Sequence, residues 1–144
     1  MARLTQTRDA AVETLRRELP GTRVEGVAGS SEVAAILRES IGAGAVFVMA
    51  LSATNAVPED SLDFDLLASC AALVIVHGRK NQTAREADGL KLAEKVAQAL
   101  HGKRFGPGFF PARLTGMAPV EDDELLARGL WAWGVTWEQR ISLG

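Results

Sequence analysis

The chain has 144 residues, of which 47% are hydrophobic and 24% are charged, proportions typical of one globular domain rather than of a disordered or fibrous chain. A balance of 16 Lys and Arg against 18 Asp and Glu gives a formal net charge of -2, which disfavours sequence-independent DNA binding through an overall positive field. The single cysteine, Cys70, excludes an internal disulfide and a cysteine zinc cluster and suits a reducing compartment.

The first residues mix basic and acidic side chains and lack an apolar signal segment, and no stretch approaches the roughly 20 apolar residues of a membrane span. We therefore expect one domain over residues 1–144, made in the cytoplasm, neither exported nor membrane-embedded.

The first third of the chain predicts a helix, a strand and a second helix. Residues 5–19 place apolar side chains at helical spacing, and Pro20 and Gly21 end that helix. Residues 22–28 predict a short edge strand. A serine at the start of residues 30–39 caps a short second helix.

Two apolar segments predict the middle of a sheet. Residues 45–51 form a continuous uncharged run, the pattern of a central strand covered on both faces. Residues 55–63 contain proline and acidic residues and predict a loop. Residues 64–77 are rich in β-formers toward their end, so we expect them to pair antiparallel with the first strand.

The clearest helix begins at Thr83, which forms a capping box with Glu86 and is followed by a glycine cap at Gly102. Its expected buried stripe is Leu90, Ala93, Val96, Ala97 and Leu100. Residues 105–111 predict an aromatic-rich loop, and residues 112–120 predict a strand that Pro119 confines to an edge or an end.

The last segment, LWAWGVTWE, places Trp131, Trp133, Val135 and Trp137 on one side of a strand with period two. Tryptophans bury about 150–250 Å² each, so this strand is expected to lie in the core. The fold class is therefore α+β, with a largely antiparallel sheet of four to five strands and helices packed on one face.

The sequence lacks a convergent set of reactive residues. The glycines of residues 42–44 precede a strand rather than follow one, unlike a dinucleotide-binding loop. His77 and His101 have no partner at ligand or triad spacing, and Cys70 lies in an apolar strand, where a thiol is normally inert. The acidic residues 121–124 predict a solvated turn rather than a calcium loop. We expect no catalytic residue, no cofactor and no metal.

The segments AVFVMAL, LVIVHGRKNQTAREADGLKLAEKVAQAL and LWAWGVTWEQRISL, after an N-terminal amphipathic helix, resemble tail terminator proteins of tailed phages. The resemblance is to the Mu-like group and, more distantly, to the lambda minor tail protein U type. It covers nearly the whole chain and consists of element order and apolar texture. The Gly-Pro-Gly loop and the early short helix do not match the family pattern.

This resemblance implies a structural virion protein of the phage neck or tail. Such proteins close into a hexameric ring, cap the tail tube, stop its polymerisation and join the head-completion proteins. The implied partners are other copies, the tube protein and a neck protein. DNA would pass through the ring without sequence-specific binding.

A head-to-tail ring requires two different complementary patches on each subunit, and the chain has charged and aromatic candidates for both. We assign to these interfaces the acidic residues Glu59, Asp60, Asp63, Asp65, Glu121, Asp122, Asp123 and Glu124, the basic residues Arg79, Lys80, Arg85, Lys103 and Arg104, and the aromatic residues Phe105, Phe109 and Phe110.

Two alternatives stay open on the sequence. One is a different structural role in the same particle, as a head-tail adaptor or tail tube subunit. The other is a small enzyme or ligand-binding domain that uses His77, Arg79 and the acidic loops, which requires a pocket.

Overall fold

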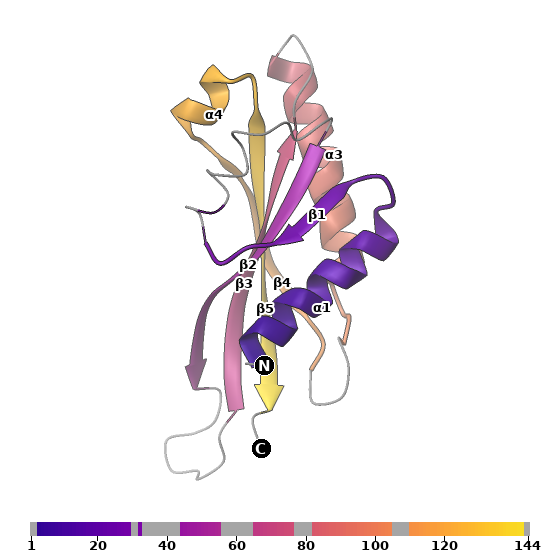
Figure 1. The fold of residues 1–144 in the computed structure, drawn as a ribbon, viewed down its shortest axis with the longest axis vertical. Helices are drawn as coiled ribbons and strands as arrows, with labels where there is room; N and C mark the ends of the chain where they lie inside the picture. The colour runs from indigo at the N-terminus through magenta and orange to yellow at the C-terminus, as the bar shows by residue number, and fades with distance from the viewer. Residues whose placement is uncertain are drawn as a thin grey trace.

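A computed structural model of the chain describes residues 3–29, 32, 44–55, 65–76, 82–104 and 110–142. The elements are α1 (Arg3–Glu18), β1 (Arg23–Gly26), β2 (Gly44–Asn55), β3 (Asp65–Val76), α3 (Gln82–Leu100), β4 (Arg113–Val120), α4 (Asp123–Ala127) and β5 (Trp131–Ser142). The strands form one five-stranded sheet in the order β1-β2-β3-β5-β4 (Figure 1). This arrangement confirms the α+β prediction.

The sheet is largely antiparallel. Only the pairing of β1 with β2 is parallel among the described strands, while β2–β3, β3–β5 and β4–β5 are antiparallel. The apolar run in β2 is buried on both faces, since Ala45 to Val48 have no solvent exposure. The predicted antiparallel pair of the two middle strands is confirmed, and so is the edge position of both β1 and the proline-containing β4.

Helices α1 and α3 cover one face of the sheet and contact each other (Figure 1). Leu15 of α1 and Val96 and Leu100 of α3 pack in one apolar cluster with alternate side chains of the strands. The predicted stripe of α3 is buried at Ala93, Val96, Ala97 and Leu100, and Leu90 is half-buried. The larger apolar cluster of the described residues therefore lies between these helices and the sheet.

The tryptophan strand lies between β3 and β4, as expected of a core element. Trp137 is fully buried, whereas Trp131 and Trp133 are half-buried. Gly89 of α3 allows a close approach to Trp133, because a Cβ at position 89 would lie 2.9 Å from the indole Cδ1. The indole nitrogens of all three tryptophans have no hydrogen-bond partner among the described residues, so the rings stabilise the fold by apolar packing.

The opposite face carries a second, smaller cluster. Leu125 of α4 and Leu130 pack there with Phe47 and Ile75. The sequence predicted a solvated turn over residues 121–124, and this was wrong for its second half, because α4 begins at Asp123. The Asp122 carboxylate caps this helix by accepting a hydrogen bond from the Leu125 N–H at 3.1 Å.

The described ends of α1 and α3 lie just before the glycines that the sequence predicted to end these helices. Gly21 and Gly102 have φ angles of 85° and 78°, the left-handed conformation that glycine adopts after a helix. Helix α3 begins at Gln82, one residue before the prediction, and its capping-box side chains lie outside the described residues. The predicted loop over residues 55–63 lies outside the described residues except for Asn55, which belongs to β2 instead. The predicted helix over residues 30–39 also lies outside them, except for Glu32, which is helical. Among the described helices, none has the length and apolarity needed to cross a membrane.

Candidate interaction surfaces

The sequence-predicted interface residues fall in three separate places. Asp65 and Phe110 lie near the end of the sheet where β3 begins, Lys103 and Arg104 follow α3, and the acidic stretch from Glu121 precedes and opens α4. Glu59, Asp60, Asp63, Arg79, Lys80, Phe105 and Phe109 lie outside the described residues, and the side chains of Arg85 and Glu124 are likewise not described.

Asp65 is engaged within the chain. Its Oδ2 accepts hydrogen bonds from Nε and Nη2 of Arg140 at 2.9 and 2.7 Å. The same guanidinium lies over the Phe110 ring, 5.2 Å from its centroid. Gln139 fixes the backbone of Phe110: its Nε2 donates a hydrogen bond to the Phe110 carbonyl at 2.7 Å. Asp65 and Phe110 thus belong to one network that fastens the end of β3 to β5.

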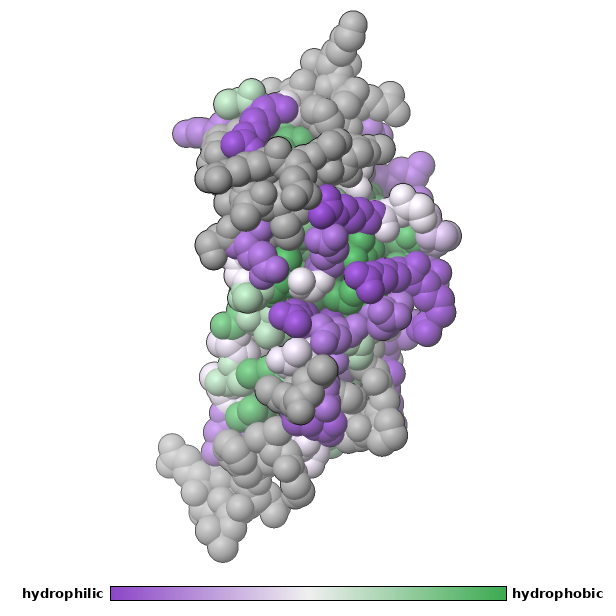
Figure 2. Space-filling view, viewed as in Figure 1, coloured by the Kyte–Doolittle hydropathy of each residue, from purple (hydrophilic) through white to green (hydrophobic). Residues whose placement is uncertain are grey.

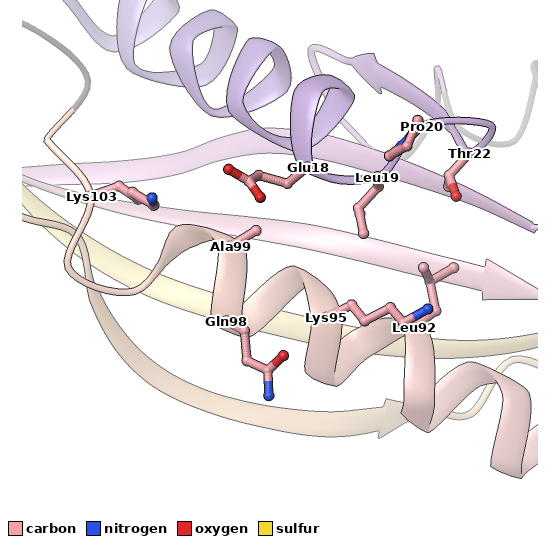
Figure 3. A pocket seen from close by; sticks show the side chains of 9 residues that line it. All are labelled: Glu18, Leu19, Pro20, Thr22, Leu92, Lys95, Gln98, Ala99 and Lys103. Carbon is pink, nitrogen blue, oxygen red and sulfur yellow. The ribbon is translucent and has the colours of Figure 1, made fainter.

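A groove of about 510 Å³ lies between the C-terminal end of α1 and the second half of α3 (Figure 3). We call it the α1/α3 groove; it is lined by Glu18, Leu19, Pro20, Thr22, Leu92, Lys95, Gln98, Ala99 and Lys103. Leu19 and Leu92 give it an apolar floor. Neither Lys95 nor Lys103 makes an ion pair with any residue that the structure describes. The sequence analysis predicted Lys103 at an interface but not Lys95. Lys95 lines the groove only because α1 packs beside α3, and the sequence does not show that packing.

The acidic stretch and α4 form a second exposed surface, the α4 segment, which comprises Val120, Glu121, Asp122, Asp123 and Leu126. Glu121 and Asp123 are exposed to solvent. The apolar side chains of Val120 and Leu126 beside them are 41% and 38% exposed. Because Leu125 packs against Phe47 and Ile75, this surface lies on the sheet face opposite to α1 and α3.

The free edges of the outer strands are obstructed. On β1, Arg16 Nε donates to the Val24 carbonyl at 3.0 Å. On β4, the Leu114 N–H donates to His101 Nδ1 at 3.3 Å, and Pro119 has no N–H to offer. Each of these features removes a backbone group that a further strand would need for pairing.

The outer edge of β2 differs beyond Val48, where its pairing with β1 ends. Val48 accepts a hydrogen bond from the Val27 N–H, so its backbone groups face this edge, and alternation places those of Ala50 on the same side. A bulge follows at Leu51, which is 55% exposed. Figure 2 shows apolar side chains over the part of β2 and β3 beyond α1. On its outer edge, opposite to β3, β2 has no described pairing partner beyond Val48.

The reactive side chains that the structure describes, Cys70 and His101, have structural roles. Cys70 is buried, and this burial raises the pKa of its thiol to about 11, so the thiolate is disfavoured at neutral pH. His101 receives the Leu114 N–H, as expected of a structural histidine, whereas His77 lies outside the described residues. Within the described part of the chain, no group of three His, Cys, Asp or Glu residues is arranged to hold a metal ion.

Comparison with solved structures shows a shared fold. The chain superposes with a TM-score of 0.60 on a chain from the virion of a native gene transfer agent particle, which is 15% identical in sequence. The similarity covers 94% of this chain and 93% of the other. No protein-family model matches the sequence, and no curated protein is significantly similar to it.

Proposed function

We propose that this chain is a structural subunit of a phage-like virion and acts as its tail terminator. The observation that supports this best is the similarity of fold, over 94% of this chain and 93% of the other, to a chain of a gene transfer agent virion. The resemblance of its apolar segments and last strand to tail terminators refines the proposal. In this role it forms a hexameric ring, caps the tail tube and stops its growth.

The proposed partners are other copies of the chain, the tube protein and a head-completion protein, with DNA passing through the ring. A ring of head-to-tail copies needs different surfaces on the two sides of each subunit. The α1/α3 groove and the α4 segment are on opposite faces of the sheet and differ in charge, which supports this architecture. The surface we assign to the tube is the outer edge of β2 around Leu51, which pairs with no strand that the structure describes.

We propose that the chain works by binding rather than by catalysis. Its cysteine is buried with a raised pKa, and His101 is engaged by a backbone N–H. The α1/α3 groove is lined by lysine, glutamate, threonine, glutamine and apolar side chains, a mixture that suits docking of another chain.

Electron microscopy of particles produced without this protein tests the proposal. Tails longer than in the wild type, without attached heads, are the expected result, and expression of the wild-type chain should restore both length and attachment. Tails of normal length beside unattached heads would assign the chain to a head-tail adaptor. Absence of any tube would assign it to the tube itself.

A further inference from the structure

We propose that the α1/α3 groove of each copy receives the α4 segment of the next copy, and that this contact builds the ring. The inference rests on the proposed function and identifies its self-assembly surfaces. It follows from the chemistry of the two surfaces and from their places on the subunit.

The groove suits an acidic guest with apolar side chains. Lys95 and Lys103 are free of ion pairs among the described residues, and Glu18 contributes the groove's one carboxylate, so cations are in excess. Arg104 is exposed directly after Lys103 and adds to this excess. Leu19 and Leu92 add apolar lining to the groove, and Leu92 lies beside Lys95 (Figure 3).

The α4 segment has the complementary composition. From Val120 to Ala127 the sequence reads VEDDELLA, which contains four carboxylates and no basic residue. Glu121 and Asp123 are exposed, while Asp122 is used to cap α4. The exposed Val120 and Leu126 can contact the apolar floor while the carboxylates meet the lysines.

The position of the two surfaces determines the kind of assembly. The groove lies on the helical face of the sheet, and α4 lies on the opposite face (Figure 1). A contact between them therefore joins two copies, and it leaves the α4 segment of one copy and the groove of the other for further neighbours. Such a heterologous contact closes into a ring when the rotation between copies completes a circle.

Charge exchange tests the contact directly. The groove variant is Lys95→Glu with Lys103→Glu, and the segment variant is Glu121→Lys with Asp123→Lys, which leaves the Asp122 cap intact. Each variant alone should associate about tenfold or more weakly than the wild type in sedimentation experiments, because like charges then meet across the contact. An equimolar mixture of the two variants should recover association, since copies that alternate restore opposite charges at every contact.

Matched controls separate this contact from general charge effects. Lys91→Glu and Glu94→Lys change exposed residues of α3 outside the groove and should leave association unchanged. All variants should retain the thermal melting of the wild type. Failure of the mixture to recover association, or equal loss in the control variants, would overturn the inference.

Cysteine crosslinking measures the same contact when association of the free protein is weak. Gln98→Cys with Asp123→Cys should give a ladder of disulfide-linked multimers on oxidation, and Glu94→Cys with Asp123→Cys should not. The buried Cys70 does not interfere. No ladder from the first pair contradicts the inference. If tail length still depends on the chain, the proposed function stands without this contact; if tail length does not, the proposed function fails as well.

Discussion

The two halves of β2 differ, although both pair with β3. Ala45 to Val48 have no solvent exposure, because β1 lies beside them, helices α1 and α3 cover one face, and the cluster with Leu125 covers the other. Beyond the bulge at Leu51, the residues Ser52 and Thr54 are exposed. One strand is therefore core at its beginning and surface at its end.

This difference follows from which elements reach each half. A strand covered on both faces must be apolar at every position, whereas an uncovered one tolerates small and polar side chains. β1 pairs with β2 only from Ala45 to Val48, and the ends of β2, β3 and β5 extend past the N-terminal end of α1 (Figure 1). Edge stretches of this kind are where a sheet can accept another chain.

The largest effect is expected from deleting β5, because the covered half of the sheet cannot form without it. A chain that ends before Trp131 lacks β5, so β3 keeps only its pairing with β2, β4 loses its pairing with the sheet, and the core loses the fully buried Trp137. We expect insoluble or unfolded protein, measured by solubility and by thermal melting in circular dichroism. A soluble truncated chain with a cooperative transition would contradict the central place of β5.

A pair of substitutions four residues apart on β2 measures the contrast itself. Phe47→Ala removes a fully buried ring from the cluster with Ile75 and should lower the free energy of unfolding by about 3–5 kcal/mol. Leu51→Ala removes a side chain that is 55% exposed and should change it by about 0.5 kcal/mol or less. Denaturant unfolding gives both values. Similar costs at the two positions would mean that the second half of β2 is covered after all.

A smaller effect is expected at the contact between α3 and β5. Gly89→Ala would normally stabilise a helix, but the added Cβ lies 2.9 Å from Trp133 Cδ1, and the bulky indole must shift. We expect a net loss of about 1–3 kcal/mol in the free energy of unfolding, the usual cost of overpacking a core. Gly29→Ala is the matched control, because nothing lies within 4 Å of its added Cβ, and it should be nearly neutral. A stabilised Gly89→Ala would show that the indole adjusts freely.

Periodicity predicted the elements that bury the most surface. The tryptophan alternation identified β5, the apolar run identified β2, and helical spacing with Gly102 identified α3 and its end. Each signal lies within a few residues of chain, where local physical preferences act. The five-residue α4 is too short to show a period, and its apolar Leu125 follows four acidic residues that indicated a turn.

The candidate surfaces were only partly predictable, because they depend on residues that are distant in sequence. Lys103 was expected at an interface, but Lys95 joins it only through the packing of α1 on α3. Asp65 was expected to face another copy, yet it meets Arg140, 75 residues away. Spacing along the chain contains no signal for such pairs, since strand order decides which side chains become neighbours.

The smallest effect is expected from breaking the Asp65–Arg140 ion pair, which joins β3 to β5 at the end of the sheet beyond α1. In the Asp65–Arg140 pair the carboxylate side chain is 17% exposed and the guanidinium 42%, so the pair is partly screened by solvent. Asp65→Asn should therefore lower the free energy of global unfolding by about 1 kcal/mol or less.

The local consequence of Asp65→Asn should be larger than the global one. Amide hydrogen exchange should accelerate at the paired ends of β3 and β5, from Asp65 to Leu67 and from Arg140 to Ser142, while the amides of Val46 to Val48 keep their wild-type protection. Glu25→Gln, which breaks the Arg23–Glu25 pair on β1, is the control and should leave the amides of β3 and β5 unchanged. Uniform acceleration in both halves would mean that the sheet opens as one unit. Acceleration confined to one end would show that the covered and uncovered halves are also distinct in stability, with the less stable half available to a partner.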